Sequence, residues 1–398
     1  MNNLKTIALS VITICSSFSF AANNYVAVIQ SNLYTTGNDT TEPPTEPPVT
    51  PPEPPVDVVF TQIVGGYDHA YGIDEDRNLW AVGDNSNGQL GLGDKVDRTT
   101  WEKTNMTNVS QIFAGNDFGY ALIVGAVYSV GSNSRGQLGL GDNTDRTRFE
   151  NTGLDGVFLL DTHPNASHAY AIKNGELYVV GSNNFGELGL GNNSSVNTWT
   201  NTKMSAERIA VGTYFGYVIS EGILYSTGYS NDGALGLGNT KSVNTWTNSG
   251  LFGASNIEAG GSHGYALKDD KLYVVGKNTQ GQLGLNHNNH MYTWTESSQT
   301  GFRTVVAGTD TGYFIKNGDL WAVGDNHAGQ LGLGNKTNKN NWTRIDSGVS
   351  NFAVGAFSTY IIESDNTLKV SGNNSKGQLG LGDKANRDSW TSLSQDTE

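Results

Sequence analysis

The chain has 398 residues and a formal net charge of −14; charged side chains make up only 16% of it, and it contains 51 glycines. This much glycine argues against a helical protein, because each glycine in a helix interior costs roughly 1 kcal/mol. An acidic surface repels phosphate backbones and anionic lipid headgroups, so we expect binding neither to nucleic acid nor to a membrane surface.

Residues 1–21 have the pattern of a secretory signal peptide. Lys5 precedes an apolar stretch over residues 6–14, and Ser19-Phe20-Ala21 has small residues at the cleavage-site positions. Cleavage after Ala21 would remove Cys15, the only cysteine, so the mature chain would have no disulfide. A lipoprotein would be acylated at Cys15, but the bulky Ile14 fits such a processing site poorly. Since no other stretch has the run of about 20 apolar residues that a membrane span needs, we expect an exported protein that is periplasmic, secreted or on the cell surface.

Residues 22–39 form a short segment before a proline-rich linker. The linker, residues 40–57, holds eight of the nine prolines and is expected to be an extended spacer. Tyr25 and Leu33 in the short segment have the same separation as Tyr71 and Leu79 further along. This suggests a partial eighth repeat; the alternative is a tether that resembles a strand pair by chance. An isolated hairpin is marginal in water, so a real one would have to dock on another surface.

From residue 58 onward, seven copies of one glycine-rich phrase organise the chain. The first copy is Gly88-Gln-Leu-Gly-Leu-Gly93, and the first glycines of successive copies are 48, 50, 47, 48, 48 and 48 residues apart. Such a period indicates one supersecondary unit copied along the chain. The repeated positions that we assign to architecture are Gly88, Leu90, Gly91, Gly136, Leu138, Gly139, Gly186, Gly233, Gly281, Gly329 and Gly377.

We interpret this phrase as structural and not as a phosphate-binding loop. A phosphate loop needs a helix N-terminus behind it and usually a basic residue, whereas Asp94, Asp142 and Asp383 follow the phrase here. Glycines allow positive φ and close approach of neighbouring units. We expect the leucines to pack between sheets and the glutamine to hydrogen-bond backbone groups across the junction.

Each unit contains four strand-sized segments. In the third unit they are Val157 to Asp161, Tyr170 to Lys173, Leu177 to Gly181 and Thr198 to Asn201. The run Leu177-Tyr-Val-Val180 is apolar throughout, which suggests a strand buried on both faces, and Asn174-Gly175 suits a tight hairpin turn. The predicted fold is therefore all-β: a seven-bladed β-propeller of four-stranded antiparallel blades over residues 58–398. A parallel β-helix is disfavoured, because it uses shorter coils and needs no hairpins.

Two ways of closing the ring remain open. Trp390 pairs beside Ile63 in the first blade, or each unit is a complete blade.

The repeat resembles that of the regulator of chromosome condensation (RCC1) family. The resemblance is carried by the phrase together with Ala259-Gly-Gly-Ser-His263-Gly-Tyr-Ala-Leu267 and Leu272-Tyr-Val-Val-Gly276-Lys-Asn278, and it covers about 340 of the 398 residues. It implies a seven-bladed propeller, here of a bacterial exported type. The family's repeated histidine is matched by His69, His168 and His263, while Phe118, Phe215, Thr311 and Ser358 stand there in other units. The resemblance implies less about activity, because one fold hosts unrelated functions.

No motif indicates catalysis, a cofactor or a metal site. His-Glu-x-x-His and Cys-x-x-Cys are absent from the sequence. His287 and His290 fall in predicted loops, and the remaining histidines mostly follow the repeat, which favours packing or solvent exposure. Asp142-Asn-Thr-Asp145 lacks the dense alternate-oxygen pattern of a calcium loop, so turn chemistry explains it. We therefore expect a protein that is not an enzyme.

A second set of aromatic residues keeps the same period. The set is Trp101, Phe149, Trp199, Trp246, Trp294, Trp342 and Trp390. One interpretation is a ring of sugar-stacking platforms, as in a multivalent lectin. The interpretation we favour is packing at blade junctions, where each ring buries roughly 150–250 Å².

The loop after the first strand of each unit varies from copy to copy. These loops should emerge together on one face around the central channel, and a constant scaffold with varied loops is a common recognition surface. Aromatic anchors among polar residues are typical of protein interfaces, although ordinary loop drift is the alternative. The candidate binding face comprises Tyr67, Asp68, Asn116, Asp117, Phe118, Tyr214, Phe215, Asp310 and Phe357.

We therefore predict an exported, monomeric, non-enzymatic module that binds another protein. The resemblance offers two precedents. Guanine-nucleotide exchange on a small GTPase with chromatin binding is disfavoured by the acidic charge and the exported location. A secreted propeller that inhibits β-lactamase through an aromatic, acidic loop face is closer, but no individual inhibitory residue can be matched. A glycan-binding lectin is the alternative from another class; it would use equivalent pockets seven times, whereas the loop tips differ.

Overall fold

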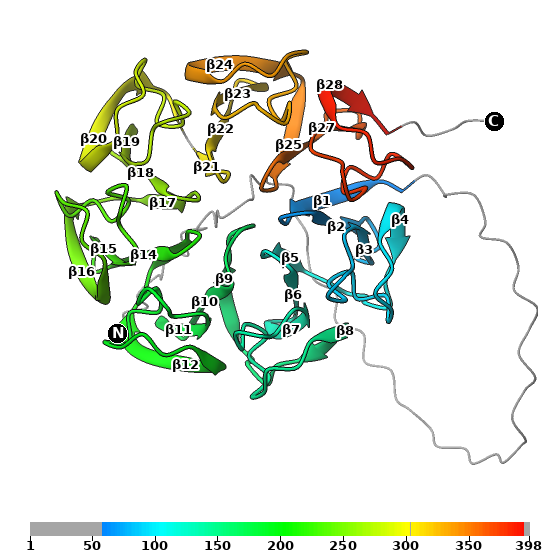
Figure 1. Ribbon diagram of the computed structural model, residues 1–398, viewed down its shortest axis with the longest axis horizontal. Coiled ribbons are helices and arrows are strands. Elements are labelled where there is room, and N and C mark those ends of the chain that lie inside the picture. The colour runs from blue at the N-terminus through cyan, green and yellow to red at the C-terminus, as the bar shows by residue number, and fades with distance from the viewer. Residues whose placement is uncertain (1–57, 303, 394–398) are drawn as a thin grey trace, which may run out of the picture.

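The computed structural model describes residues 58–302 and 304–393 of the chain. Their strands form seven four-stranded antiparallel sheets arranged as a ring, which confirms the predicted all-β, seven-bladed propeller (Figure 1). The predicted signal peptide, the segment 22–39 and the linker 40–57 lie outside the described residues. Over the described ranges there is no helix long and apolar enough to cross a membrane.

Each blade consists of four strands that are consecutive in the chain, with the first nearest the ring axis and the fourth at the rim (Figure 1). Blades 1 to 3 contain β1 (Phe60–Gly65), β2 (His69–Asp74), β3 (Leu79–Gly83) and β4 (Arg98–Lys103); β5 (Gln111–Ala114), β6 (Phe118–Ile123), β7 (Ala126–Gly131) and β8 (Arg146–Asn151); β9 (Val157–Asp161), β10 (His168–Lys173), β11 (Glu176–Gly181) and β12 (Val196–Ser205).

Blades 4 to 7 repeat the pattern. They contain β13 (Arg208–Val211), β14 (Phe215–Ser220), β15 (Ile223–Gly228) and β16 (Val243–Phe252); β17 (Asn256–Ala259), β18 (His263–Lys268), β19 (Lys271–Gly276) and β20 (Met291–Thr300); β21 (Val306–Ala307), β22 (Thr311–Lys316), β23 (Asp319–Gly324) and β24 (Lys339–Ser347); β25 (Val349–Val354), β26 (Ser358–Glu363), β27 (Leu368–Gly372) and β28 (Arg387–Ser392).

The hairpin between the second and third strands has the turn chemistry that the sequence predicts. In blade 3, Lys173 pairs with Glu176, so the turn is Asn174-Gly175. Both turn residues have positive φ, 54° and 76°, as a two-residue hairpin turn of this type requires. The turn end of this hairpin lies opposite the end from which the variable loops emerge, because consecutive antiparallel strands reverse direction.

The glycine phrase lies at the junction between each blade and the next. A Cβ added to Gly136 would lie 2.5 Å from the Cβ of Asn197 on the rim strand of the following blade, and one added to Gly139 would lie 2.6 Å from the Trp199 indole nitrogen. Leu138 is fully buried in a core shared by blades 2 and 3. The hydrophobic core is thus divided into inter-blade layers, and the phrase keeps neighbouring blades close.

The phrase glutamine makes different bonds from those we predicted. Its Oε1 accepts a hydrogen bond from the backbone N–H two residues earlier in the same loop, as between Gln137 and Arg135 at 2.8 Å. Across two junctions its Nε2 donates to a carboxylate instead of a backbone group: Gln282 to Asp310 and Gln378 to Asp68, both at 2.8 Å. Gln282 and Gln378 therefore contact the variable loop of the following blade, whereas Gln89 and Gln330 donate to Asp84 and Asp325 of their own blades.

Ring closure occurs between complete blades. Within the described part of the chain, β1 pairs only with β2, and β28 pairs only with β27. Trp390 therefore does not pair beside Ile63, and each unit is its own blade. Blades 7 and 1 are joined by side chains and loops: the Ala356 N–H donates to the Gly66 carbonyl at 3.0 Å, and Gly380 faces the Trp101 indole as Gly139 faces Trp199.

Candidate binding face on the propeller

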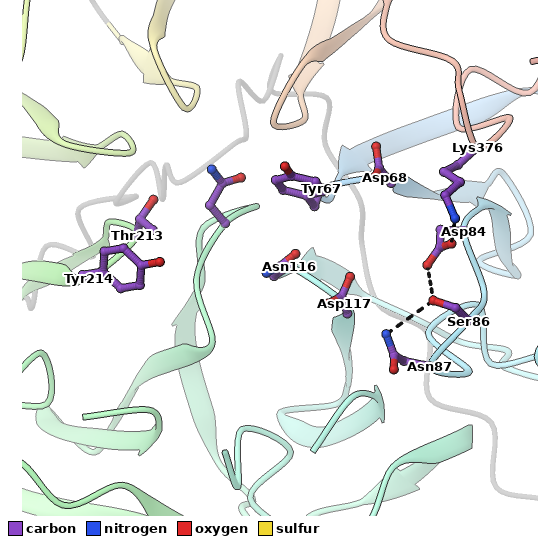
Figure 2. Close-up of a pocket in the computed structure, with 11 residues that line it drawn as sticks. Tyr67, Asp68, Asp84, Ser86, Asn87, Asn116, Asp117, Thr213, Tyr214 and Lys376 are labelled. Atoms are coloured by element: carbon purple, nitrogen blue, oxygen red, sulfur yellow. Dashed lines mark hydrogen bonds and ion pairs between the residues drawn. The ribbon is translucent and has the colours of Figure 1, made fainter. Parts of the chain in front are cut away.

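One face of the ring carries a hollow of about 520 Å³ (Figure 2). It is formed by two series of loops, those between the first and second strands and those between the third and fourth strands, which emerge at the same end of each blade. The residues that line it come from blades 7, 1, 2, 3 and 4 and are Tyr67, Asp68, Asp84, Ser86, Asn87, Asn116, Asp117, Asn165, Thr213, Tyr214 and Lys376.

A long loop in blade 3 crosses the mouth of the central channel. It has six residues, 162–167, between β9 and β10, where blade 2 has three. The Ala166 carbonyl accepts a bond from the Asn116 N–H in blade 2 at 3.1 Å, and the Thr309 hydroxyl of blade 6 lies 3.4 Å from the Asn165 side-chain oxygen. A second cavity, of about 30 Å³, is lined by His163 and Glu258 among others and is large enough for about one water.

Three aspartates and one lysine dominate the electrostatics of the hollow. The Lys376 ammonium lies 2.7 Å from the Asp84 carboxylate. Asp68 accepts bonds from the neutral amides of Asn373 and Gln378; burial and the charge of Asp84 raise its pKa. Burial, followed by the charges of Asp84 and Asp68, raises the pKa of Asp117 to about 6. The hollow is therefore a site of incompletely compensated negative charge.

Exposed aromatic side chains continue the hollow towards blade 4. Tyr214 is 46% exposed and Phe185 is 37% exposed. The Phe185 ring lies 5.0 Å from that of Tyr214 and 4.9 Å from that of Tyr229, centroid to centroid. We call Phe185, Tyr214 and Tyr229 the aromatic patch. Because Tyr214 also lines the hollow, the patch and the acidic residues form one surface.

The structure brings five of the nine predicted face residues into the hollow: Tyr67, Asp68, Asn116, Asp117 and Tyr214. Two predictions were wrong. Phe118 and Phe215 are 0% and 2% exposed, because each begins the second strand of its blade and points inward onto a tyrosine two residues later. They belong to the core and cannot anchor a partner.

The last two predicted residues lie outside the hollow lining. Asp310 is bonded to the Lys277 ammonium at 3.0 Å and to Gln282, so it joins blades 5 and 6. Phe357 packs edge-on against Tyr67, with ring centroids 5.6 Å apart. It supports a residue of the hollow without lining it.

Sequence reasoning missed a second variable position on this face. The residue before the first glycine of the phrase differs in every copy and supplies Asn87, Lys376 and the exposed Phe185 to the surface. The series is Asn87, Arg135, Phe185, Asp232, Gln280, Ala328 and Lys376. Its variation beside an invariant glycine was a usable signal.

The periodic aromatic residues pack between blades, as we favoured. Trp199, Trp246 and Trp294 lie 5.7, 5.6 and 5.4 Å from a buried tyrosine of the preceding blade, centroid to centroid. A ring of open sugar-stacking platforms is therefore not formed by these side chains.

The repeated histidines are buried and neutral. Burial lowers the pKa of His69 to about 4 and the pKa values of His168 and His263 to about 3. Gly260-Gly-Ser-His-Gly264 has the spacing of a nucleophile elbow, but it turns from strand β17 into strand β18, whereas an elbow leads into a helix. Over the described ranges no group of three or more His, Cys, Asp or Glu side chains could hold a metal ion.

Comparisons with known proteins agree with this architecture. Two family profiles described as "Regulator of chromosome condensation (RCC1) repeat" match residues 60–89 and 76–122. No curated protein matches the chain.

Solved structures share the fold at low sequence identity. Yeast RCC1 (Prp20), in a structure bound to Kap60, has a TM-score of 0.71 and 16% identity, covering 90% of this chain and 92% of that one. Prp20p from Saccharomyces cerevisiae has a TM-score of 0.71 and 18% identity, covering 85% and 88%. Human WBSCR16 has a TM-score of 0.69 and 16% identity, covering 80% and 95%. The chain therefore carries RCC1-type repeats over residues 60–122 and shares its propeller fold with these structures.

Proposed function

We propose that this protein is a non-enzymatic module that binds another protein through the face that carries the hollow. The observation that carries the proposal is the contrast within the repeat: both series of variable residues meet around one hollow, while the invariant residues lie at the blade junctions. The hollow combines aromatic and polar side chains, and the exposed aromatic patch adjoins it. Such a composition is typical of the centre of protein interfaces.

Proteins of the same fold offer a general precedent for this mode of action. One of the similar structures is a complex of yeast RCC1 with Kap60, and another was described with its binding properties to Gsp1p and histones. At 16–18% identity we carry over only the use of the propeller as a protein-binding scaffold. A secreted inhibitor of a β-lactamase-type enzyme is one instance of this proposal, and the aromatic, acidic lining of the hollow favours testing it.

An exported location is part of the proposal and is supported by the signal-like residues 1–21. Determining the N-terminus of the mature protein would test it. Processing after Ala21 is the expected result, and an intact N-terminus recovered from the cytoplasm would contradict it.

Capture of partners by the mature protein, compared between variants, tests the binding face. The double variant Tyr67→Ala/Tyr214→Ala removes two aromatic side chains of the hollow and should lower capture at least about tenfold, as loss of interface anchors does. The matched control is Phe158→Ala. Phe158 is 51% exposed and lies at the opposite end of its blade, since the neighbouring Val157 bonds to the hairpin turn at Gly125. Equal loss in both variants, or loss in the control alone, would exclude the hollow face.

A further inference from the structure

We propose that the hollow receives a basic loop of the partner protein. A lysine or arginine of that loop lies against the Asp117 and Asp68 carboxylates, and an apolar side chain next to it packs on the aromatic patch. This inference rests on the proposed function and specifies the chemistry of the partner.

The first support is the state of Asp117, which differs from that of equivalent residues in other blades. Asp68, Asp117 and Asp310 occupy the same repeat position, the last residue of the loop between the first and second strands of their blades. The phrase glutamine of the preceding blade donates to two of them, Gln378 to Asp68 and Gln282 to Asp310. The glutamine that precedes Asp117 is Gln89, and its Nε2 donates instead to Asp84 at 2.6 Å.

Asp117 is thereby left open towards the hollow. No side chain of the described residues bonds its carboxyl group, although its backbone carbonyl accepts the Ser132 N–H at 2.8 Å. The one ammonium in the lining, that of Lys376, is engaged by Asp84 at 2.7 Å and lies 4.0 Å from Asp97. Asp117 is only partly buried, but a partly desolvated carboxylate without a partner still carries a cost, and a cation supplied from outside would reduce it.

The second support is the position of the aromatic patch beside these carboxylates. A cavity of about 520 Å³ lies within the range of about 300–1,000 Å³ that is usual for ligand sites, so it can enclose one long basic side chain. A free small cation would fill the hollow and leave Phe185 and Tyr229 uncovered. A protein loop covers both, because consecutive side chains reach the carboxylates and the patch. Charge complementarity with a chain of net charge −14 also favours a basic partner and faster encounter.

The affinity for such a basic loop should depend on pH, because the Asp117 carboxyl group titrates. The charged groups that face Asp117 are Asp84, Asp68 and Asp145, which raise its pKa, and Lys376, which lowers it; burial is the largest cause and brings the pKa to about 6. A basic side chain binds the ionised carboxylate. Affinity should therefore be constant above about pH 7 and weaken as the pH falls through 6.

Selection from a phage-displayed library of cyclic peptide loops, panned against the mature full-length chain, tests the inference without knowledge of the natural partner. The expected result is enrichment of loops with Lys or Arg next to an apolar residue. For the enriched loops, Asp117→Asn should lower affinity about tenfold or more, the range for loss of a charge-assisted hydrogen bond. The matched control, Asp310→Asn, removes the same charge at the same repeat position outside the hollow and should leave affinity unchanged.

The outcomes separate this inference from the proposed function. Enriched loops that lack a basic residue but depend on Tyr67 and Tyr214 would overturn the inference and leave the protein-binding proposal intact. Enriched loops unaffected by both the tyrosine and the Asp117 substitutions would overturn both. Spermidine binding in the hollow with an affinity equal to that of the loops would identify a small cation as the ligand and also overturn the inference. Failure to enrich any loop would count against it in the same way. Asp117→Asn is expected to fold, since it removes an unpaired charge.

Discussion

The blade junctions and the loop face are built from the same repeat but treat their side chains in opposite ways. At the junctions the repeated residues are buried and identical in role: Leu138 fills an inter-blade core, and the Tyr120 hydroxyl donates to the Gln137 carbonyl. On the loop face the same repeat carries an exposed Tyr214 and an Asp117 without a side-chain partner among the described residues. The repeated positions therefore stabilise the fold, whereas the variable positions can hold side chains that are unfavourable for stability but available for binding.

Replacement of Phe118 by Ala tests this division most severely. Phe118 is fully buried against Tyr120, so its truncation should cost about 3–5 kcal/mol of unfolding free energy. Tyr214→Ala, at the exposed neighbouring position in another blade, should change it by no more than about 0.5 kcal/mol. Urea unfolding of both variants measures the difference. Similar values for the two would mean that the loop face and the core are not separated as described.

The acid sensitivity of the junctions follows from their buried histidines. Burial lowers the pKa of His168 to about 3, so between pH 6.5 and 3 the unfolded chain binds more protons than the folded one. Stability should therefore be full above about pH 6.5 and fall as the pH decreases, by roughly 3 kcal/mol per histidine at pH 4. His168→Phe, which copies the residue at the equivalent positions 118 and 215, should reduce this loss. Urea unfolding at pH 7.5 and 4.5 measures it, and an unchanged pH dependence would contradict the assignment.

The close approach of neighbouring blades can be broken at a single glycine. In Gly136→Ala the new Cβ would lie 2.5 Å from the Cβ of Asn197. The alanine would also have to adopt the φ of 77° that Gly136 has. We expect a loss of roughly 2–3 kcal/mol from strain and overpacking together. Gly175→Ala is the matched control, because φ is 76° there but no atom lies within 4 Å of the added Cβ. It should cost only about 1 kcal/mol, and equal losses would show that the junction is not tight.

The smallest expected effect is that of Asp117→Asn, which should raise the stability of the fold, whereas the substitutions in the core and at the junctions lower it. Its folded pKa of about 6 lies above the ordinary value of 3.8, so the folded state binds the extra proton and this residue destabilises the fold above pH 6. After allowance for partial solvent exposure, Asp117→Asn should raise stability by about 1 kcal/mol at pH 7.5. The gain should vanish near pH 4, where the wild-type carboxyl group is protonated in the folded protein. Thermal unfolding at the two pH values would detect it, and a loss of stability at pH 7.5 would show that the carboxylate has a partner.

Most of the fold could be predicted from the sequence because blade formation is local. The 48-residue period, the hairpin turn at Asn174-Gly175 and the apolar third strand specify each blade within its own unit. The same period placed Leu138 and Trp199 at junctions, since identical blades must pack in the same way all round the ring. Five residues of the hollow were also found, because their loops vary where the scaffold does not.

Tertiary structure decided which of the variable residues reach the surface and which groups meet there. Phe118 and Tyr214 both come from the loop series, yet one points into the core and the other into the hollow, since successive strand residues alternate in direction. Lys376 reaches Asp84 across 292 residues, and the long loop of blade 3 reaches Thr309 in blade 6. Local periodicity determines a blade, but only the closure of the ring brings residues from distant blades to one place, so the charge balance of the hollow could not be read from any single repeat.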